Sequence, residues 1–142
     1  MPAHRRKLLR EIQNVSAEEL MQCWPDGRIK MRATQRLLQL RREHPDLFLL
    51  GKYEPLIFEG QLAECAVGFV RAHQQKRVAV IVPRLSSRVG FPPVNAKWGD
   101  TAVRWEGKLR DVFCTREVRS ENSQIKLADA MSALPFAVLG NL

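Results

Sequence analysis

The chain has 142 residues, of which 45% are hydrophobic and 27% charged, the ordinary composition of a globular protein. This length allows one domain, or one small domain with a helical extension, and excludes a complete β/α barrel, which takes about 250 residues. The net charge of +8 is high, and residues 1–52, with 11 Lys and Arg against 6 Asp and Glu, carry most of it, which would suit contact with an acidic surface or a nucleic acid.

Two short helices are predicted near the N-terminus. Residues 4–13 place leucine and isoleucine side chains on one side of a helix. Ser16 begins a capping-box sequence, Ser-Ala-Glu-Glu, and a second helix is expected from there to Cys23.

The longest helical pattern begins at or just after Asp26 and Gly27, a helix-breaking pair, and ends before Pro45, which cannot continue the hydrogen-bond ladder. One stripe of this helix is apolar, and its members are Ile29, Ala33, Leu37 and Leu40. Such a stripe needs a surface to dock on. Left bare, it would favour self-association as a dimer, or it would leave the helices less protected than the sheet.

From residue 53 the apolar period changes toward two, which is typical of β-strands. Strands are predicted at residues 53–59, 65–71, 77–82, 100–105, 109–114, 124–127 and 136–139. The β-branched segment RVAVIV is expected to be central, and residues 85–98 are expected to form a long loop that is functional or covers the core. The predicted fold class is α+β, with N-terminal helices in residues 1–51 and an antiparallel β-sandwich domain in residues 52–142.

No active site of the chain's own is predicted. The three cysteines lie far apart and the three histidines lack metal-ligand spacing, so no disulfide framework, metal or cofactor is expected. The acidic residues Asp100, Asp111, Glu117 and Asp129 are expected to be solvated or salt-bridged rather than paired for catalysis. Reduced cysteines predict a cytoplasmic protein, and no apolar run approaches the roughly 20 residues that span a membrane.

The order of several motifs resembles the C-terminal region of the maltooligosyl trehalose synthases, a family of the α-amylase superfamily. The motifs are DGRIK, LLxLRREHPDLF, GKYEPL, VAVIVPRL, GFPP, KWGDTAV, RDVFCTREV and IKLADAMSALPFAVL. The resemblance covers nearly all of residues 24–142 and is weaker for residues 1–23. The chain departs from the family at Cys114 and Thr115, where a turn ending in Thr-Gly is more usual.

The resemblance implies an intramolecular transglucosylase, an isomerase of trehalose biosynthesis. Such an enzyme converts the reducing-end α-1,4 bond of a maltooligosaccharide into an α,α-1,1 bond. Its Asp nucleophile and Glu acid/base come from loops of a β/α barrel, which would lie before residue 1. The chain would then be a C-terminal fragment with a supporting role, inactive alone. Its partner would be the rest of the parent barrel, and it would meet maltooligosaccharide only through that parent.

Within this resemblance, Asp26, Arg28 and Lys30 are the residues expected to reach substrate. They lie at a turn that enters a barrel helix, and residues near the βα loops face the active side of a barrel. The structural alternative is that Asp26 caps the helix while Arg28 and Lys30 are solvated.

A different class of function stays open, a small stand-alone basic domain that binds nucleic acid or glucan. Glucan could stack on Trp98 or Trp105, although a tryptophan more often belongs to a core. Nucleic acid is not expected as a partner, because acidic residues interrupt the basic helices and no recognised motif accompanies them.

Overall fold

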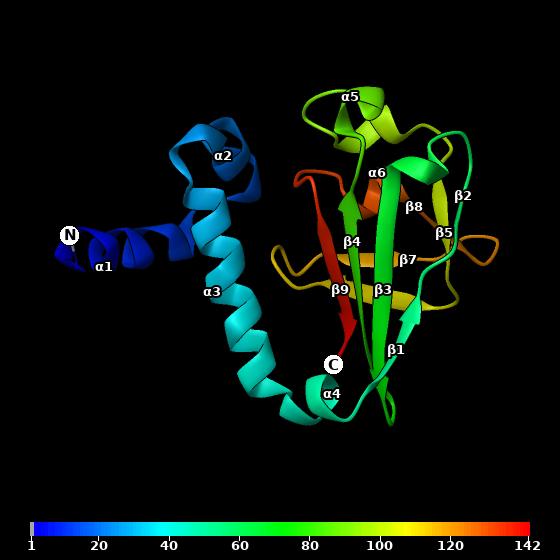
Figure 1. Ribbon diagram of the computed structural model, residues 1–142, viewed down its shortest axis with the longest axis horizontal. Coiled ribbons are helices and arrows are strands. Elements are labelled where there is room, and N and C mark those ends of the chain that lie inside the picture. The colour runs from blue at the N-terminus through cyan, green and yellow to red at the C-terminus, as the bar shows by residue number, and fades with distance from the viewer. Residues whose placement is uncertain (1) are drawn as a thin grey trace.

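The computed structural model describes residues 2–142 and divides into two parts (Figure 1). Four helices come first, α1 (Pro2–Glu11), α2 (Ala17–Gln22), α3 (Arg28–Glu43) and α4 (Pro45–Leu49), and we call this part the helical region. The strands follow from residue 52, and we call that part the β domain. The predictions for α1, α2 and α3 are confirmed, whereas the short helix α4 was not predicted.

Local sequence accounts for the helix boundaries. The Ser16 Oγ accepts a hydrogen bond from the backbone N–H of Glu19 at 3.1 Å, so the predicted capping box does cap α2. His44 leaves the helical conformation and ends α3. Pro45 then occupies the first position of α4, where its missing N–H costs nothing, so the proline that ends one helix starts the next.

The strands form two antiparallel sheets. The larger sheet has the order β1-β3-β4-β9-β6-β7 and the smaller one the order β2-β5-β8. The bounds are β1 (Lys52–Pro55), β2 (Phe58–Glu59), β3 (Ala66–His73), β4 (Lys76–Pro83), β5 (Ala102–Arg104), β6 (Lys108–Asp111), β7 (Glu117–Arg119), β8 (Gln124–Lys126) and β9 (Ala137–Asn141). The α+β class with antiparallel pairing is therefore confirmed, and β4 lies inside its sheet between β3 and β9 as predicted.

Two details of the strand prediction are wrong. The single strand expected at residues 53–59 is two strands, β1 and β2, which belong to different sheets. The strand β7 was not predicted, and it pairs with β6.

The main core lies in the β domain. Its fully buried side chains include Ile81, Trp98, Leu127, Met131 and Leu139. A second, smaller cluster joins the helical region to the β domain, and its buried members are Leu40, Leu47, Val78, Val112 and Val138.

The loop predicted at residues 85–98 covers the main core and contains the short helix α5 (Ser86–Val89) and a 3₁₀ turn. Trp98 is completely buried there, and its Nε1–H donates to the carbonyl oxygen of Pro93 at 2.8 Å. Trp105 is also buried, and the Arg77 guanidinium lies 4.6 Å from its ring centroid. This burial argues against stacking of glucan on either ring, which stays an untested prediction.

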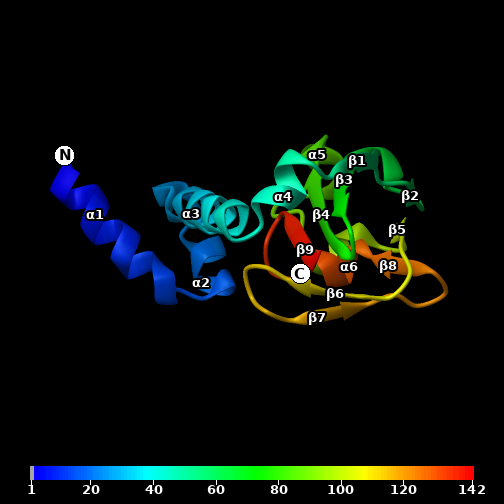
Figure 2. The ribbon, with the colours of Figure 1, turned by 90° about the horizontal axis from the view of Figure 1, so that it is seen from below.

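The helical region lies beside the β domain (Figures 1 and 2). Helix α4 packs on β3, and α1 points away from the β domain at the far end. Among residues 2–142, no helix has the length and apolar character needed to cross a membrane.

Candidate interaction surface

A set of exposed apolar side chains lies on and next to the helical region. Its members are Trp24, Leu37, Leu38, Leu49, Leu50 and Tyr53, and we call this set the apolar face. Leu49 and Leu50 are 70% and 68% exposed. Full burial of a leucine side chain contributes about 1.5–3 kcal/mol, a contribution that Leu49 and Leu50 do not make within this chain.

The predicted stripe of α3 is fully buried only at Leu40. Leu40 is buried in the cluster that joins α3 to the β domain. Ile29 and Ala33 are half-buried, and Leu37 is exposed. The stripe therefore docks within the chain at Leu40, while Leu37 is left without such cover.

Polar contacts reinforce the covered end of the helical region. The Arg36 Nε donates to the carbonyl oxygen of Val112 at 3.1 Å. The Arg71 guanidinium donates to the carbonyl oxygen of Phe48 in α4. These bonds join side chains to backbone atoms more than twenty positions away, so they fix α3 and α4 against the sheet.

At its other end the helical region meets the β domain through two aromatic rings. The centroids of Trp24 and Phe91 are 5.0 Å apart with the rings tilted by 54°. Both side chains stay largely exposed, at 47% and 59%. An aromatic pair contributes about 0.5–1.5 kcal/mol beyond its buried area, so this contact is weaker than the apolar cluster at Leu40.

The predicted substrate residues Asp26 and Arg28 bind each other. The Asp26 Oδ1 accepts the backbone N–H of Arg28 at 2.9 Å, and Oδ2 accepts its Nε–H at 2.7 Å. The backbone hydrogen bond, helped by the guanidinium, lowers the pKa of Asp26, and the same pair raises the pKa of Arg28. Gly27, with φ +80°, permits the turn between them.

These hydrogen bonds stabilise the first turn of α3 and favour a structural role for Asp26 and Arg28. Lys30 is exposed. A contact between these three residues and a substrate stays a prediction.

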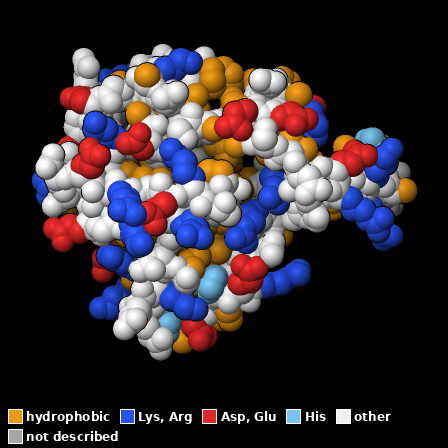
Figure 3. Space-filling view, turned by 180° about the vertical axis from the view of Figure 1, so that it is seen from behind, with side chains coloured by type: hydrophobic (Ala, Val, Ile, Leu, Met, Phe, Trp, Pro, Cys, Tyr) orange, Lys and Arg blue, Asp and Glu red, His pale blue; other side chains and the backbone are white. Residues whose placement is uncertain are grey.

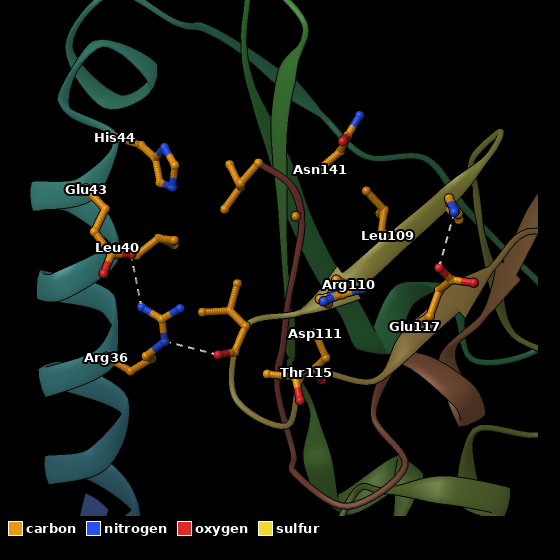
Figure 4. Close-up of a pocket in the computed structure, with 14 residues that line it drawn as sticks. Arg36, Leu40, Glu43, His44, Leu109, Arg110, Asp111, Thr115, Glu117 and Asn141 are labelled. Carbon is orange, nitrogen blue, oxygen red and sulfur yellow. Dashed lines mark hydrogen bonds and ion pairs between the residues drawn. The ribbon is translucent and has the colours of Figure 1, made fainter.

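A groove that the sequence did not predict lies between α3 and the strands β6 and β9 (Figure 4). Its volume is about 500 Å³. Charged side chains line it from both walls, among them Arg36 on α3 and Arg110 on β6. From behind, Lys and Arg side chains are spread over the middle and lower part of the molecule, with Asp and Glu side chains among them (Figure 3). No local sequence motif predicts this groove, because the elements that form its two walls are more than sixty positions apart in the sequence.

Three of the acidic residues weighed for catalysis have structural partners. The Asp111 Oδ1 accepts two backbone N–H groups of the following turn, at 2.7 and 3.1 Å. The Asp100 Oδ1 accepts the backbone N–H of Gln61 at 3.2 Å. Glu117 bonds to Arg119 at 2.6 Å, which lowers the pKa of its carboxyl. Over the described part of the chain, no cluster of three or more His, Cys, Asp or Glu is arranged to hold a metal ion.

No protein-family model matches the chain, and a search of curated proteins returns no match.

Proposed function

We propose that the chain is the C-terminal region of a maltooligosyl trehalose synthase and supports the catalytic barrel of that enzyme. The observation that supports the proposal best is the apolar face, which lies largely on the helical region. A second support is the ordered series of motifs from DGRIK to the C-terminus.

In this proposal α3 is the last helix of the barrel. A barrel helix buries its apolar stripe against the strands inside it. Leu37 and Leu38 are exposed here, and the barrel would cover them. Because each buried leucine contributes about 1.5–3 kcal/mol, these contacts would hold the barrel and the helical region together.

The two antiparallel sheets then form the β-sandwich that follows the barrel, with the boundary between residues 1–51 and residues 52–142. The junction between the helical region and the β domain requires a glycine at position 51. A Cβ added at Gly51 would lie 2.1 Å from the carbonyl oxygen of Leu47, far inside van der Waals contact. The chain therefore passes from α4 to β1 through a close approach that no side chain permits.

The chain alone is expected to be inactive, because catalysis of this kind needs two carboxylates that flank the bond. The test is to clone the coding sequence upstream of Met1, express the extended chain and the chain of 142 residues, and incubate each with maltopentaose. The account predicts loss of reducing ends with the extended chain alone. An upstream sequence that encodes no barrel, or activity of the shorter chain that survives repurification, would contradict it.

The alternative is a stand-alone basic domain that binds nucleic acid or glucan, and one feature of α1 favours it. Arg6, Lys7 and Arg10 are exposed on this helix, and one of them, Lys7, forms an ion pair, with Glu11 at 3.8 Å. Retention on heparin that falls steeply with salt would favour this alternative over the barrel fragment.

A further inference from the structure

The groove between α3 and the strands β6 and β9 has the dimensions of a ligand site. Its volume of about 500 Å³ lies in the range of roughly 300–1,000 Å³ that is common for small-molecule pockets. Its charged lining consists of Arg36, Lys108, Arg110, Glu43, Asp111 and Glu117. The numbers of basic and acidic side chains are equal, so charge counting predicts no preference, and the hydrogen bonds that each group already makes must decide.

Two of the three acids are already satisfied by neighbours. Asp111 is 6% exposed, and one of its oxygens accepts two backbone N–H groups of its own turn. Glu43 accepts a hydrogen bond from Gln39 at 2.8 Å and lies 3.5 Å from the Arg36 guanidinium. Both carboxylates are therefore poor partners for a ligand cation.

The third acid, Glu117, bonds to Arg119 at 2.6 Å and to Lys108 at 3.4 Å. Arg110 is different, since within residues 2–142 no carboxylate oxygen lies within 4 Å of its guanidinium. In Figure 4 Arg110 lies in the middle of the groove, with Arg36 on the side of α3 and Glu117 on the other side. The acidic side chains of the groove are thus all bonded to neighbouring groups, whereas the Arg110 guanidinium at its centre has no carboxylate partner in the part of the chain that the structure describes.

We propose that this groove binds a small molecule through an anionic group, a phosphate or a carboxylate, held by Arg110. A guanidinium presents parallel N–H groups that match two oxygens of such an anion, and these charge-assisted bonds are the strong ones. The net charge of +8 raises the local concentration of anions.

This site does not depend on the proposed function. The groove lies where α3 meets the larger sheet. The apolar cluster around Leu40 holds these two elements together without any other part of an enzyme. A negative result here would leave the barrel proposal untouched, and an inactive enzyme would leave this proposal untouched.

The experiment is a titration of the ¹⁵N-labelled full chain with inorganic phosphate and, separately, with acetate, followed by amide chemical shifts. We expect saturable shifts that are largest at residues 109–112 and 140–142, and an affinity that falls as sodium chloride is added. Saturation by phosphate alone assigns a phosphate-bearing ligand, and saturation by acetate as well assigns carboxylates too.

Three variants test the role of Arg110. Arg110→Ala should weaken binding at least tenfold. Arg110→Lys keeps the positive charge but loses the parallel N–H groups of the guanidinium, so it should bind with intermediate affinity. Arg88→Ala is the matched control, because it removes the same charge from an exposed ion pair with Glu64 outside the groove. The amide spectrum of each variant shows whether it is folded.

The proposal is overturned by any of three results. These are no saturable shifts up to tens of millimolar of either anion, wild-type affinity of a folded Arg110→Ala, or an equal loss in Arg88→Ala, which would mean that net charge alone attracts the anion.

Discussion

The helical region and the β domain differ in how completely their apolar side chains are buried. In the β domain, Trp98, Leu127 and Leu139 are completely buried, and loops close over the core. In the helical region, Leu38 and Leu49 are exposed at more than half of their surface. The helical region also has buried side chains, Ile12 and Leu20, but its exposed leucines are the surface that the proposed barrel would cover.

The largest effect is expected in the β domain. Leu139→Ala should lower the free energy of unfolding by about 2–5 kcal/mol, because it leaves a cavity in a closed core. Leu38→Ala on the exposed surface of α3 is the matched control and should change it by less than about 0.5 kcal/mol. Urea denaturation measures both, and equal effects would mean that Leu38 packs as tightly as Leu139 does.

The next largest loss of stability is expected at the junction between the helical region and the β domain. Gly51→Ala should destabilise the protein by about 1–3 kcal/mol, because the new Cβ collides with the carbonyl oxygen of Leu47 and forces α4 away from β3. Lys52→Ala, at the exposed neighbouring position, should be close to neutral. If Gly51→Ala unfolds at the same urea concentration as the wild type, the junction is flexible and the two parts are less rigidly joined.

The smallest effect belongs to Asp26. Its folded pKa lies below the ordinary value of 3.8, so its contribution to stability is present above that pH and is lost as the pH falls through the folded pKa. Asp26→Asn should therefore remove a small part of the acid dependence of unfolding and leave stability at neutral pH slightly reduced. An NMR titration of the Asp26 carboxyl should give a pKa below 3.8, and a higher value would mean that the bond with Arg28 does not persist in solution.

Some elements were predictable because single residues set them. Gly27 and Pro45 bound α3 by their backbone chemistry, and the β-branched residues 77–82 make β4 the centre of its region. Strand β7 has three residues, Glu117–Arg119, of which two are charged, so it carries no apolar pattern of its own and forms because β6 lies beside it.

The groove and the apolar face could not be predicted, for a physical reason. Arg36 and Arg110 line one groove although 73 intervening positions separate them in the sequence, and packing alone decides their approach. The stripe of α3 was visible from the sequence, but the sequence did not show that Leu40 would be covered while Leu37 stayed exposed.

Amide hydrogen exchange, with light scattering on the same sample, tests most directly whether the helical region lacks a partner. For the monomer, we expect α3 to exchange faster than β3 and β4, because Leu37 and Leu38 are exposed on it. If light scattering shows a dimer, α3 should become protected only at concentrations where the dimer forms. A strict monomer in which α3 is as protected as β4 would contradict the account, since the β domain alone would then complete the helical region.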